Sequence, residues 1–259
     1  MLSLAQIQAQ YPAALRPFGR FMLREYLQHK LLQLIYDSPL ASRLFFLGGT
    51  CLRIVHGNSR FSEDLDFDNT GVTTAEFDEL ANFLAKGLAL EGYEVEMKLV
   101  YKGACHCHVR FPELLFRAGL SGHREERILI QLGTEPQNFG FEPELHVLNR
   151  FDVFAQIQTT PPDLLLAQKF YAILNRVRNK GRDFYDATFL LGRQVTPNYA
   201  YLAQKRGIET PAELRAQLLA HCQTLDMAAM AADVRPFLFD PRDDRRVLLF
   251  PQYIQQVLR

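Results

Sequence analysis

The chain lacks the features that mark several large classes of protein. Positive and negative side chains balance to a formal net charge of zero, so no global basic field favours nucleic acid, and any such contact needs a local patch. No apolar run approaches the roughly 20 residues of a membrane span, and the first ten residues lack the basic and apolar regions of a secretory signal. Low-complexity tracts and internal repeats are also missing. We therefore expect a globular protein without a membrane partner.

Cysteine is scarce, with four residues in 259. Cys105 and Cys107 are too close in sequence for an ordinary disulfide, and the other two lie in helical patterns. Reduced thiols in the cytosol are the simplest interpretation, which predicts a cytoplasmic protein. The run from Cys105 to His108 invites a zinc interpretation, but on a strand its cysteines face one way and its histidines the other. No second ligand pair stands at zinc spacing, so alternating strand residues are favoured.

The pattern of apolar residues changes near residue 158. Before it, helical and alternating patterns mix, and a capping box at Thr73 and Glu76 opens one helix. After it, an N-cap with two prolines starts a run of helices, and Thr210 and Glu213 form a second capping box. The expected strands lie at residues 44–47, 65–68, 93–101, 105–111, 127–132, 145–148 and 151–157, and the expected later helices at about 163–180, 183–191, 197–205, 211–224 and 250–258.

One early segment combines features of phosphate and metal chemistry. After an apolar strand-like run, Gly48-Gly49-Thr50 forms a turn whose glycines let backbone amides approach a phosphate at the start of a short helix. After thirteen intervening residues come Asp64 and Asp66, which share one face of the predicted strand. Two carboxylates this close are costly unless a cation neutralises them. An exposed strand can carry such a pair without function, but Leu65 and Phe67 point to a core, which favours a metal and phosphate site.

A second group of charged residues lies in the helical part. Lys169 sits in an apolar stretch, where a lysine needs an anion such as a triphosphate. If one helix continues unbroken, Lys169, Arg176 and Lys180 form a basic stripe, although a solvated face is the favoured interpretation of Arg176. Asp183 and Asp186 stand at the start of the next helix. Asp183 is expected to cap this helix, or the pair orients Lys180 or Arg182 or takes a proton.

With both groups in order, the chain resembles the nucleotidyltransferase toxins of the AbiEii/AbiGii type, also called MenT-like, within the DNA polymerase β-like superfamily. The superfamily signature, Gly-Gly or Gly-Ser followed by acid–apolar–acid, is matched by Gly48-Gly49-Thr50 and Asp64-Leu65-Asp66. The family's Arg-x-Ser is matched by Arg60-Phe61-Ser62. Its lysine and its Lys-Gly-Arg-Asp-x-Tyr-Asp stretch are matched by Lys169 and by Lys180 to Asp186.

The resemblance implies an α/β fold, a polymerase-β-like core with a mixed sheet flanked by helices, followed by a C-terminal helical bundle. It implies a nucleotidyltransferase domain over residues 1–158 and a helical domain over residues 159–259 that closes the active-site cleft. It also implies a toxin of a toxin–antitoxin system that transfers a nucleoside monophosphate from an NTP to an RNA acceptor, typically the tRNA 3′ end. A cognate antitoxin is the usual partner.

The resemblance also assigns roles to residues. Asp64 and Asp66 would hold two Mg²⁺ ions, which bind the triphosphate and lower the pKa of the attacking hydroxyl. Lys169, Asp183 and Asp186 would complete the catalytic set. The implied nucleotide-binding residues are Gly48, Gly49, Thr50, Arg60, Ser62, Lys169, Lys180 and Arg182.

The sequence departs from this pattern on one central strand. Related chains supply a third carboxylate there, where this sequence has Gln131, and Gly133 replaces a second acid. A neutral amide binds Mg²⁺ weakly and is a poor general base. Glu135 substitutes only if the strand bends. Either the enzyme works with two acids and another group, or its activity is reduced.

Two other interpretations stay open. Gln131 favours a degenerate member that binds nucleotide or RNA without catalysis. The other is a transferase acting on a small molecule, against which the Lys180 to Asp186 stretch speaks only through the resemblance.

Overall fold

The structure is a computed structural model that describes residues 1–259 apart from the side chain of Lys102. Its internal packing divides the chain into two compact units. The first comprises Met1–Val55 and Phe61–Thr159, and the second comprises His56–Arg60 and Thr160–Arg259. The short segment His56–Arg60 therefore belongs to the C-terminal unit, although it interrupts the first unit in sequence. The apolar pattern of the sequence did not predict that this segment packs with the C-terminal unit.

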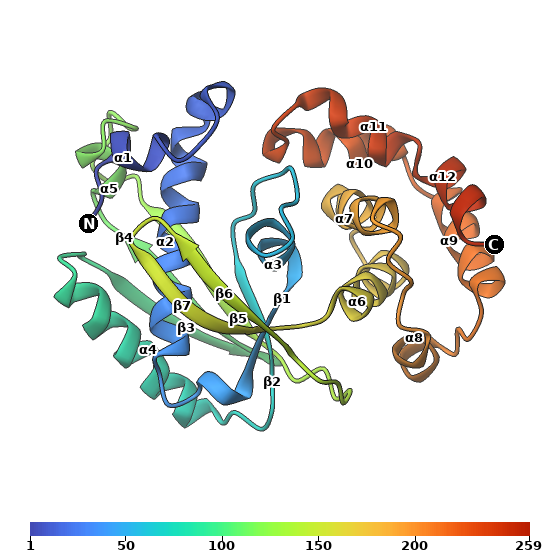
Figure 1. The fold of residues 1–259 in the computed structure, drawn as a ribbon, viewed down its shortest axis with the longest axis horizontal. Helices are drawn as coiled ribbons and strands as arrows, with labels where there is room; N and C mark the ends of the chain where they lie inside the picture. The colour runs from blue at the N-terminus through green and yellow to red at the C-terminus, as the bar shows by residue number, and fades with distance from the viewer. The chain divides into compact units, whose positions relative to one another are not determined.

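The first unit is built on one sheet. Its strands are β1 (Leu44–Leu47), β2 (Leu65–Asn69), β3 (Glu96–Lys102), β4 (Ala104–Phe111), β5 (Ile128–Thr134), β6 (Glu144–Arg150) and β7 (Val153–Thr159). They form a seven-stranded sheet in the order β3-β4-β5-β2-β1-β7-β6 (Figure 1). β1 pairs in parallel with β7 and β2 with β5, whereas the other neighbours are antiparallel. This mixed sheet, together with its helices, confirms the predicted α/β fold.

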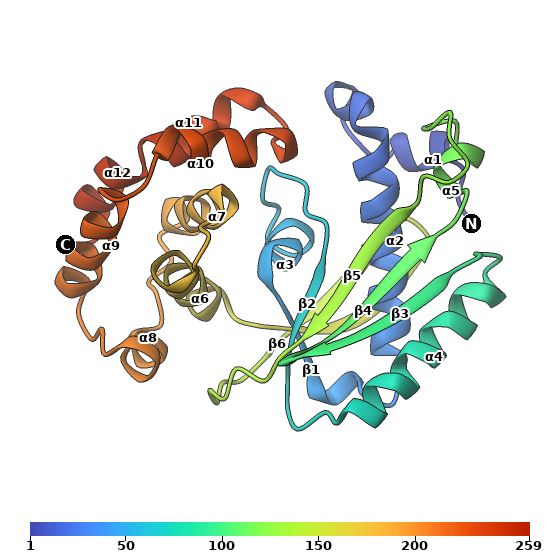
Figure 2. The ribbon, with the colours of Figure 1, turned by 180° about the vertical axis from the view of Figure 1, so that it is seen from behind.

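Helices cover the apolar face of this sheet. The helices of the first unit are α1 (Leu4–Gln8), α2 (Gly19–Tyr36), α3 (Gly48–Ile54), α4 (Thr74–Leu90) and α5 (Leu114–Arg117). α2 packs on β5 and β7, and α4 packs on β3 and β4 (Figure 2). Because successive strand residues point to opposite faces, Leu65 and Phe67 are buried while Asp66 between them is partly exposed. The sheet thus separates an apolar core from a face that carries polar side chains.

The second unit is helical apart from the segment that contains Arg60. Its α-helices are α6 (Pro162–Asn175), α7 (Gly181–Gly192), α8 (Tyr199–Arg206), α9 (Pro211–Cys222), α10 (Met227–Val234), α11 (Arg245–Leu248) and α12 (Phe250–Val257). α7 packs on α6, α10, α11 and α12, and therefore forms the centre of the unit. α10 and α11 are the helices that the sequence pattern did not predict. No helix of the described chain is long and apolar enough to cross a bilayer.

The two predicted capping boxes are both present. In α4, the Thr73 hydroxyl accepts from the backbone N–H of Glu76, and the Glu76 carboxylate accepts from the backbone N–H of Thr73 at 2.8 Å. Thr210 and Glu213 repeat the arrangement at the start of α9. These caps satisfy amide groups that the first helical turn leaves without partners.

The predicted continuous helix over residues 163–180 is wrong. α6 ends at Asn175, and Arg176 has an extended backbone with φ −69° and ψ 132°. The Asn179 side chain donates to the carbonyl of Ile173 at 2.6 Å. A side chain therefore satisfies one of the last carbonyls of α6, which a further helical turn would otherwise bind. Lys180 is the N-cap of α7. Lys169, Arg176 and Lys180 therefore do not form a stripe on one helix.

Candidate functional site

The turn after β1 brings backbone close to one of the predicted metal carboxylates. β1 and β2 are paired so that Leu47 lies opposite Asp66, and α3 begins at the next residue, Gly48. Gly48 has φ +79°, a conformation that side chains rarely adopt. A Cβ at this position would lie 3.0 Å from the Asp66 Oδ2 atom. The glycine is required both by the turn and by the carboxylate beside it.

A second glycine lies against the other oxygen of Asp66. In the parallel pair of β2 and β5, Gly133 is the partner of Asp66. A Cβ on Gly133 would lie 3.3 Å from Asp66 Oδ1 and 3.1 Å from the Nδ1 atom of His106, its partner on β4. Both carboxylate oxygens of Asp66 therefore face space that any larger residue at Gly48 or Gly133 would fill. A cradle of this kind fits a cation bound to a carboxylate.

Hydrogen bonds from two helices hold the segment that leads to the acids. Asp64 immediately precedes β2, and its backbone carbonyl accepts a short hydrogen bond from the buried hydroxyl of Thr50 on α3. The amide of Gln28 on α2 donates to the carbonyls of Ser62 and Glu63 at 3.2 and 2.9 Å. The positions of Asp64 and Asp66 are therefore fixed by backbone contacts as well as by the strand.

α3 is itself anchored by a buried ion cluster. Arg53 of α3 binds the carboxylate of Glu25 on α2 through two contacts of 2.8 and 3.2 Å, and Arg150 reaches the same carboxylate at 2.6 Å. Glu25 is 2% exposed. Burial raises the pKa of this carboxyl, but Arg53 and Arg150 outweigh burial and leave the pKa below its ordinary value. The helix that follows the glycine turn is thus tied to the core.

The predicted charged residues of the second unit form a compact cluster. The Nζ atom of Lys169 lies 2.9 Å from Asp183 and 2.9 Å from Asp186. The anion that a lysine in this apolar stretch requires is therefore supplied by two carboxylates of the protein. Arg176 also pairs with Asp183, at 3.3 Å. Asp183 lies in the first turn of α7, but its side chain serves Lys169 and Arg176 and not the helix cap.

Asp186 is the centre of that cluster. The guanidinium of Arg60 donates to its two oxygens at 2.7 and 2.6 Å, and the Asn58 amide donates at 2.8 Å. Arg60 is 1% exposed and Asp186 is 0% exposed. Burial raises the pKa of Asp186, but Arg60 and Lys169 lower it by more than burial raises it, so its pKa is below the ordinary value. For Lys169, burial lowers the pKa, and Asp183 and Asp186 more than restore it.

Two further predicted nucleotide-binding residues of the second unit have structural roles of their own. Lys180 is the N-cap of α7. The guanidinium of Arg182 lies over the ring of Phe237, 4.6 Å from its centre. Nucleotide contacts of Lys180, Arg182, Arg60 and Ser62 stay predictions, and for Arg60 the structure shows a fully buried partner in Asp186.

Sequence reasoning missed two residues of these sites. Asn58 lies two residues before Arg60 and donates to Asp186, but it belongs to none of the sequence motifs. His106 lies beside Asp66, although the zinc motif in which it was considered gave no reason to place it there. The alternation of that strand gave a usable signal, since Cys107 is fully buried and His106 and His108 point to the partly exposed face.

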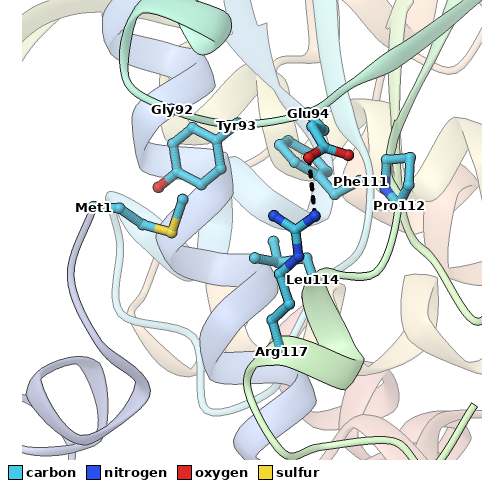
Figure 3. A pocket seen from close by; sticks show the side chains of 8 residues that line it. All are labelled: Met1, Gly92, Tyr93, Glu94, Phe111, Pro112, Leu114 and Arg117. Carbon is cyan, nitrogen blue, oxygen red and sulfur yellow. Dashed lines mark hydrogen bonds and ion pairs between the residues drawn. The ribbon is translucent and has the colours of Figure 1, made fainter. Parts of the chain in front are cut away.

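The rest of the first unit offers a hollow that is too small for a nucleotide. It is lined by Tyr93, Glu94, Arg117 and neighbouring residues, with Glu94 and Arg117 joined at 2.9 Å (Figure 3). Its volume of about 10 Å³ holds a single water molecule. Within the described part of the chain, no three side chains of His, Cys, Asp or Glu converge closely enough to hold a metal by themselves. A cation at Asp66 would therefore keep water and phosphate ligands, as Mg²⁺ commonly does.

Gly48→Ala, compared with a control, is expected to distinguish the cost of the positive φ from the effect of a side chain beside the Asp66 carboxylate. The positive φ costs about 1–2 kcal/mol for a residue with a Cβ, and the new atom also displaces the Asp66 carboxylate. Gly71→Ala is the matched control, since Gly71 has φ +63° and open space around its Cβ position. We expect both variants to lose similar stability in thermal unfolding. For the nucleotide transfer that the resemblance implies, we expect Gly48→Ala to lose about 100-fold more activity. Equal activities of the two variants would contradict the role of Gly48.

Comparison with known proteins agrees with this architecture. Residues 30–250 match the family model described as nucleotidyl transferase AbiEii toxin, type IV TA system. The fold is similar to that of JHP933 from Helicobacter pylori, with 18% identity, a TM-score of 0.54, and 92% of this chain and 93% of that chain covered. A second H. pylori structure, provisionally assigned as a nucleotidyltransferase, has 17% identity, a TM-score of 0.55, and 92% and 96% coverage. No curated protein matches the sequence.

The two solved structures show the fold, and the family model shows the family because it spans most of the chain. Nucleotidyltransferases of this family generally use an NTP and a divalent metal. The chain belongs to the AbiEii family of nucleotidyltransferase toxins of type IV toxin–antitoxin systems.

Proposed function

We propose that the protein transfers a nucleoside monophosphate from an NTP to an RNA acceptor in a Mg²⁺-dependent reaction. The observation that carries this proposal is the cradle around Asp66, where Gly48 and Gly133 leave space beside both carboxylate oxygens. The start of α3 adds backbone amides on the Gly48 side, and a helix start favours phosphate. Phosphate groups and a cation can therefore be held side by side.

The proposal gives separate tasks to the residues of the site. Asp66 and Asp64 hold the divalent metal, two Mg²⁺ ions in the fully loaded enzyme, and the Gly48 and Gly49 amides receive the β- and γ-phosphates. Bound Mg²⁺ supplies charge neutralisation at the triphosphate and activation of the attacking hydroxyl. The buried Thr50 hydroxyl positions the backbone at Asp64.

Lys169 is proposed as the phosphate-binding cation of the second unit. Asp186 and Asp183 hold its ammonium group in place, and we assign Arg60 and Asn58 to position Asp186. The catalytic roles of Lys169, Asp183 and Asp186 rest on this arrangement together with the family's motif. Arg60 serves in this proposal through Asp186 and not through direct contact with nucleotide.

The acceptor and partner are proposed from the family. We propose a cognate antitoxin as protein partner, because the family model describes a toxin of a type IV toxin–antitoxin system. We propose the tRNA 3′ end as acceptor from the resemblance alone. All four cysteines are free thiols, which supports action in the cytoplasm.

The test is a transfer assay with four labelled nucleotides. The protein is incubated with Mg²⁺, each α-labelled NTP in turn, and total tRNA, and label is followed into RNA and into small molecules. We expect label on tRNA with at least one NTP, removed by chelation of the metal. Label on a small molecule would support the other class of transferase, and no transfer with any nucleotide, where a family member is active, would overturn the proposal.

A degenerate member that binds nucleotide without turnover is the second candidate, and Gln131 favours it. In this protein Gln131 lies on β5 on the same face as Gly133, with its amide nitrogen 3.4 Å from His106 Nδ1. If the missing acid is what limits catalysis, Gln131→Glu is expected to gain transfer over wild type while nucleotide affinity by calorimetry stays similar. A wild-type protein that is already active, with no gain in Gln131→Glu, would exclude this candidate.

A further inference from the structure

The last strand of the sheet carries an exposed apolar face. β6 ends the strand order, so its outer side has no neighbouring strand among the described residues. Leu145 and Val147 of β6 are 65% and 50% exposed. Phe154 on β7, the partner of Asn149, is 72% exposed. Alternate residues of a strand share a face, and so do partners on neighbouring strands, so these three apolar side chains lie on one face of the sheet.

The two edges of the sheet differ in how they are protected. β3, at the opposite edge, has Glu96 and Lys98 at exposed positions, and charged side chains on an edge strand oppose pairing with another chain. β6 contains no proline or glycine, and its seven residues pair with β7 without a bulge. Its exposed residues between the two ends are Leu145, Val147 and Asn149, which carry no charge. A regular, uncharged edge of this kind can accept a further strand.

The backbone of β6 offers hydrogen-bonding groups along this edge. Arg150 and Val153 are partners on either side of a two-residue turn, and the pair that closes such a hairpin exchanges hydrogen bonds. The direction of bonding then alternates along the strand. Leu145, Val147 and Asn149 therefore direct their backbone N–H and C=O groups away from β7. The residues that form the uncharged face are also the ones that can pair with a new strand.

We propose that β6 pairs with β6 of a second copy of this chain, antiparallel and around a two-fold axis at Val147. In this register all seven residues of the strand are paired, and Val147 lies opposite its own copy. Leu145 of one copy lies opposite Asn149 of the other, and Glu144 lies opposite Arg150, so no like charges meet. Arg150 already binds a buried carboxylate of α2, so the apolar centre contributes more to the pairing than the charged ends.

The chemistry of the face favours a second copy over RNA. In the paired form, the apolar side chains of both copies lie on the same face, where Val147 contacts its own copy and Leu145 lies diagonal to it. The residues between them on β6 and β7 are Asn149, Gln156 and Gln158, which are also uncharged. RNA binding depends on cations that neutralise phosphates, whereas the centre of a protein–protein interface is depleted in charge.

The first experiment measures the molar mass of the full chain by light scattering after gel filtration, over a range of protein concentrations. We expect a dimer for the wild type and a monomer for Val147→Lys, because two ammonium groups would face each other at the axis. Leu90→Lys is the matched control, since Leu90 is 90% exposed at the end of α4 and should leave the dimer intact. A wild type that is monomeric at every concentration, or a dimer that survives Val147→Lys, would overturn the inference.

Cross-linking tests the register. Under mild oxidation we expect Val147→Cys to form a disulfide between copies, because directly paired residues have Cα atoms about 5.5 Å apart. Leu145→Cys should form none, whereas Leu145→Cys/Asn149→Cys should. The wild type, with four free cysteines of which three are buried, gives the background. Equal cross-linking of Val147→Cys and Leu145→Cys would contradict the two-fold at Val147. Neither measurement depends on nucleotide transfer, so both results hold whether or not the proposed reaction is found.

Discussion

Asp66→Asn is expected to reduce nucleotide transfer at least about 1,000-fold, which corresponds to about 4 kcal/mol of lost transition-state stabilisation. Asparagine keeps the shape of the side chain and its place between Gly48 and Gly133. In the proposed reaction it removes the negative charge that would bind the cation, and with it the stabilisation of charge on the triphosphate. The measurement is the steady-state rate of label transfer to tRNA at saturating NTP, together with relief of growth inhibition in cells.

The folded state should survive this substitution. Asp66 is partly exposed and next to Asp64, so loss of one negative charge does not weaken the core. We expect a thermal midpoint equal to that of the wild type or slightly higher. Asp37→Asn, an exposed change at the end of α2, is the control and should keep full activity. An Asp66→Asn protein with wild-type rates would refute the assignment of the metal site.

Much of the first unit could be predicted from its sequence, because local rules agree with the final packing there. Alternation of apolar residues located β2 and β4, and the glycine turn before α3 marked the phosphate-binding candidate. The contact of Asp66 with Gly48 depends on the pairing of β1 with β2, which the sequence pattern did not assign. The row that joins His106 to Asp66 did not follow, because strand order and register depend on contacts between residues far apart in the sequence.

The second unit shows where sequence patterns fail. The charge pattern from Lys169 to Lys180 is compatible with one helix, but the amide of Asn179 and the close packing of Gly181 end it. A Cβ on Gly181 would lie 1.8 Å from the carbonyl oxygen of Met230, so this start of α7 is fixed by a helix that had not been predicted. Lys169 was correctly expected to need an anion, but the sequence could not show that Asp183 and Asp186 provide it.

Asp186→Ala is expected to destabilise the second unit by about 3–5 kcal/mol, the cost of removing one partner from a buried ion pair. Arg60 would keep a buried guanidinium without its two carboxylate contacts, and Lys169 would keep Asp183 as its acidic partner. The measurement is hydrogen exchange of the α7 backbone, which reports on the second unit even if the first stays folded. Asp243→Asn, whose contact with Arg246 is long at 3.8 Å and partly exposed, should change stability by less than about 1 kcal/mol.

A second substitution tests whether the effect comes from the unpaired charge. In Arg60→Leu/Asp186→Leu both charges are removed, so the double variant should be more stable than Asp186→Ala. Its loss of stability should also be smaller than the sum of the losses in the two single variants. Strictly additive losses would contradict a buried ion pair as the cause. Equal protection of α7 in wild type and Asp186→Ala would contradict it as well.

The same cluster sets the acid stability of the second unit. The pKa of Asp186 is lowered from its ordinary value of 3.8 in spite of burial, because Arg60 and Lys169 stabilise the charged form. A lowered folded-state pKa contributes stability that is complete above the unfolded value and is lost as the pH falls through the folded value. The wild-type protein should therefore lose protection of α7 as the pH falls below about 3.8, whereas Asp186→Ala should lack this component. An Asp186→Ala protein with the full wild-type acid dependence would assign that dependence to other carboxylates.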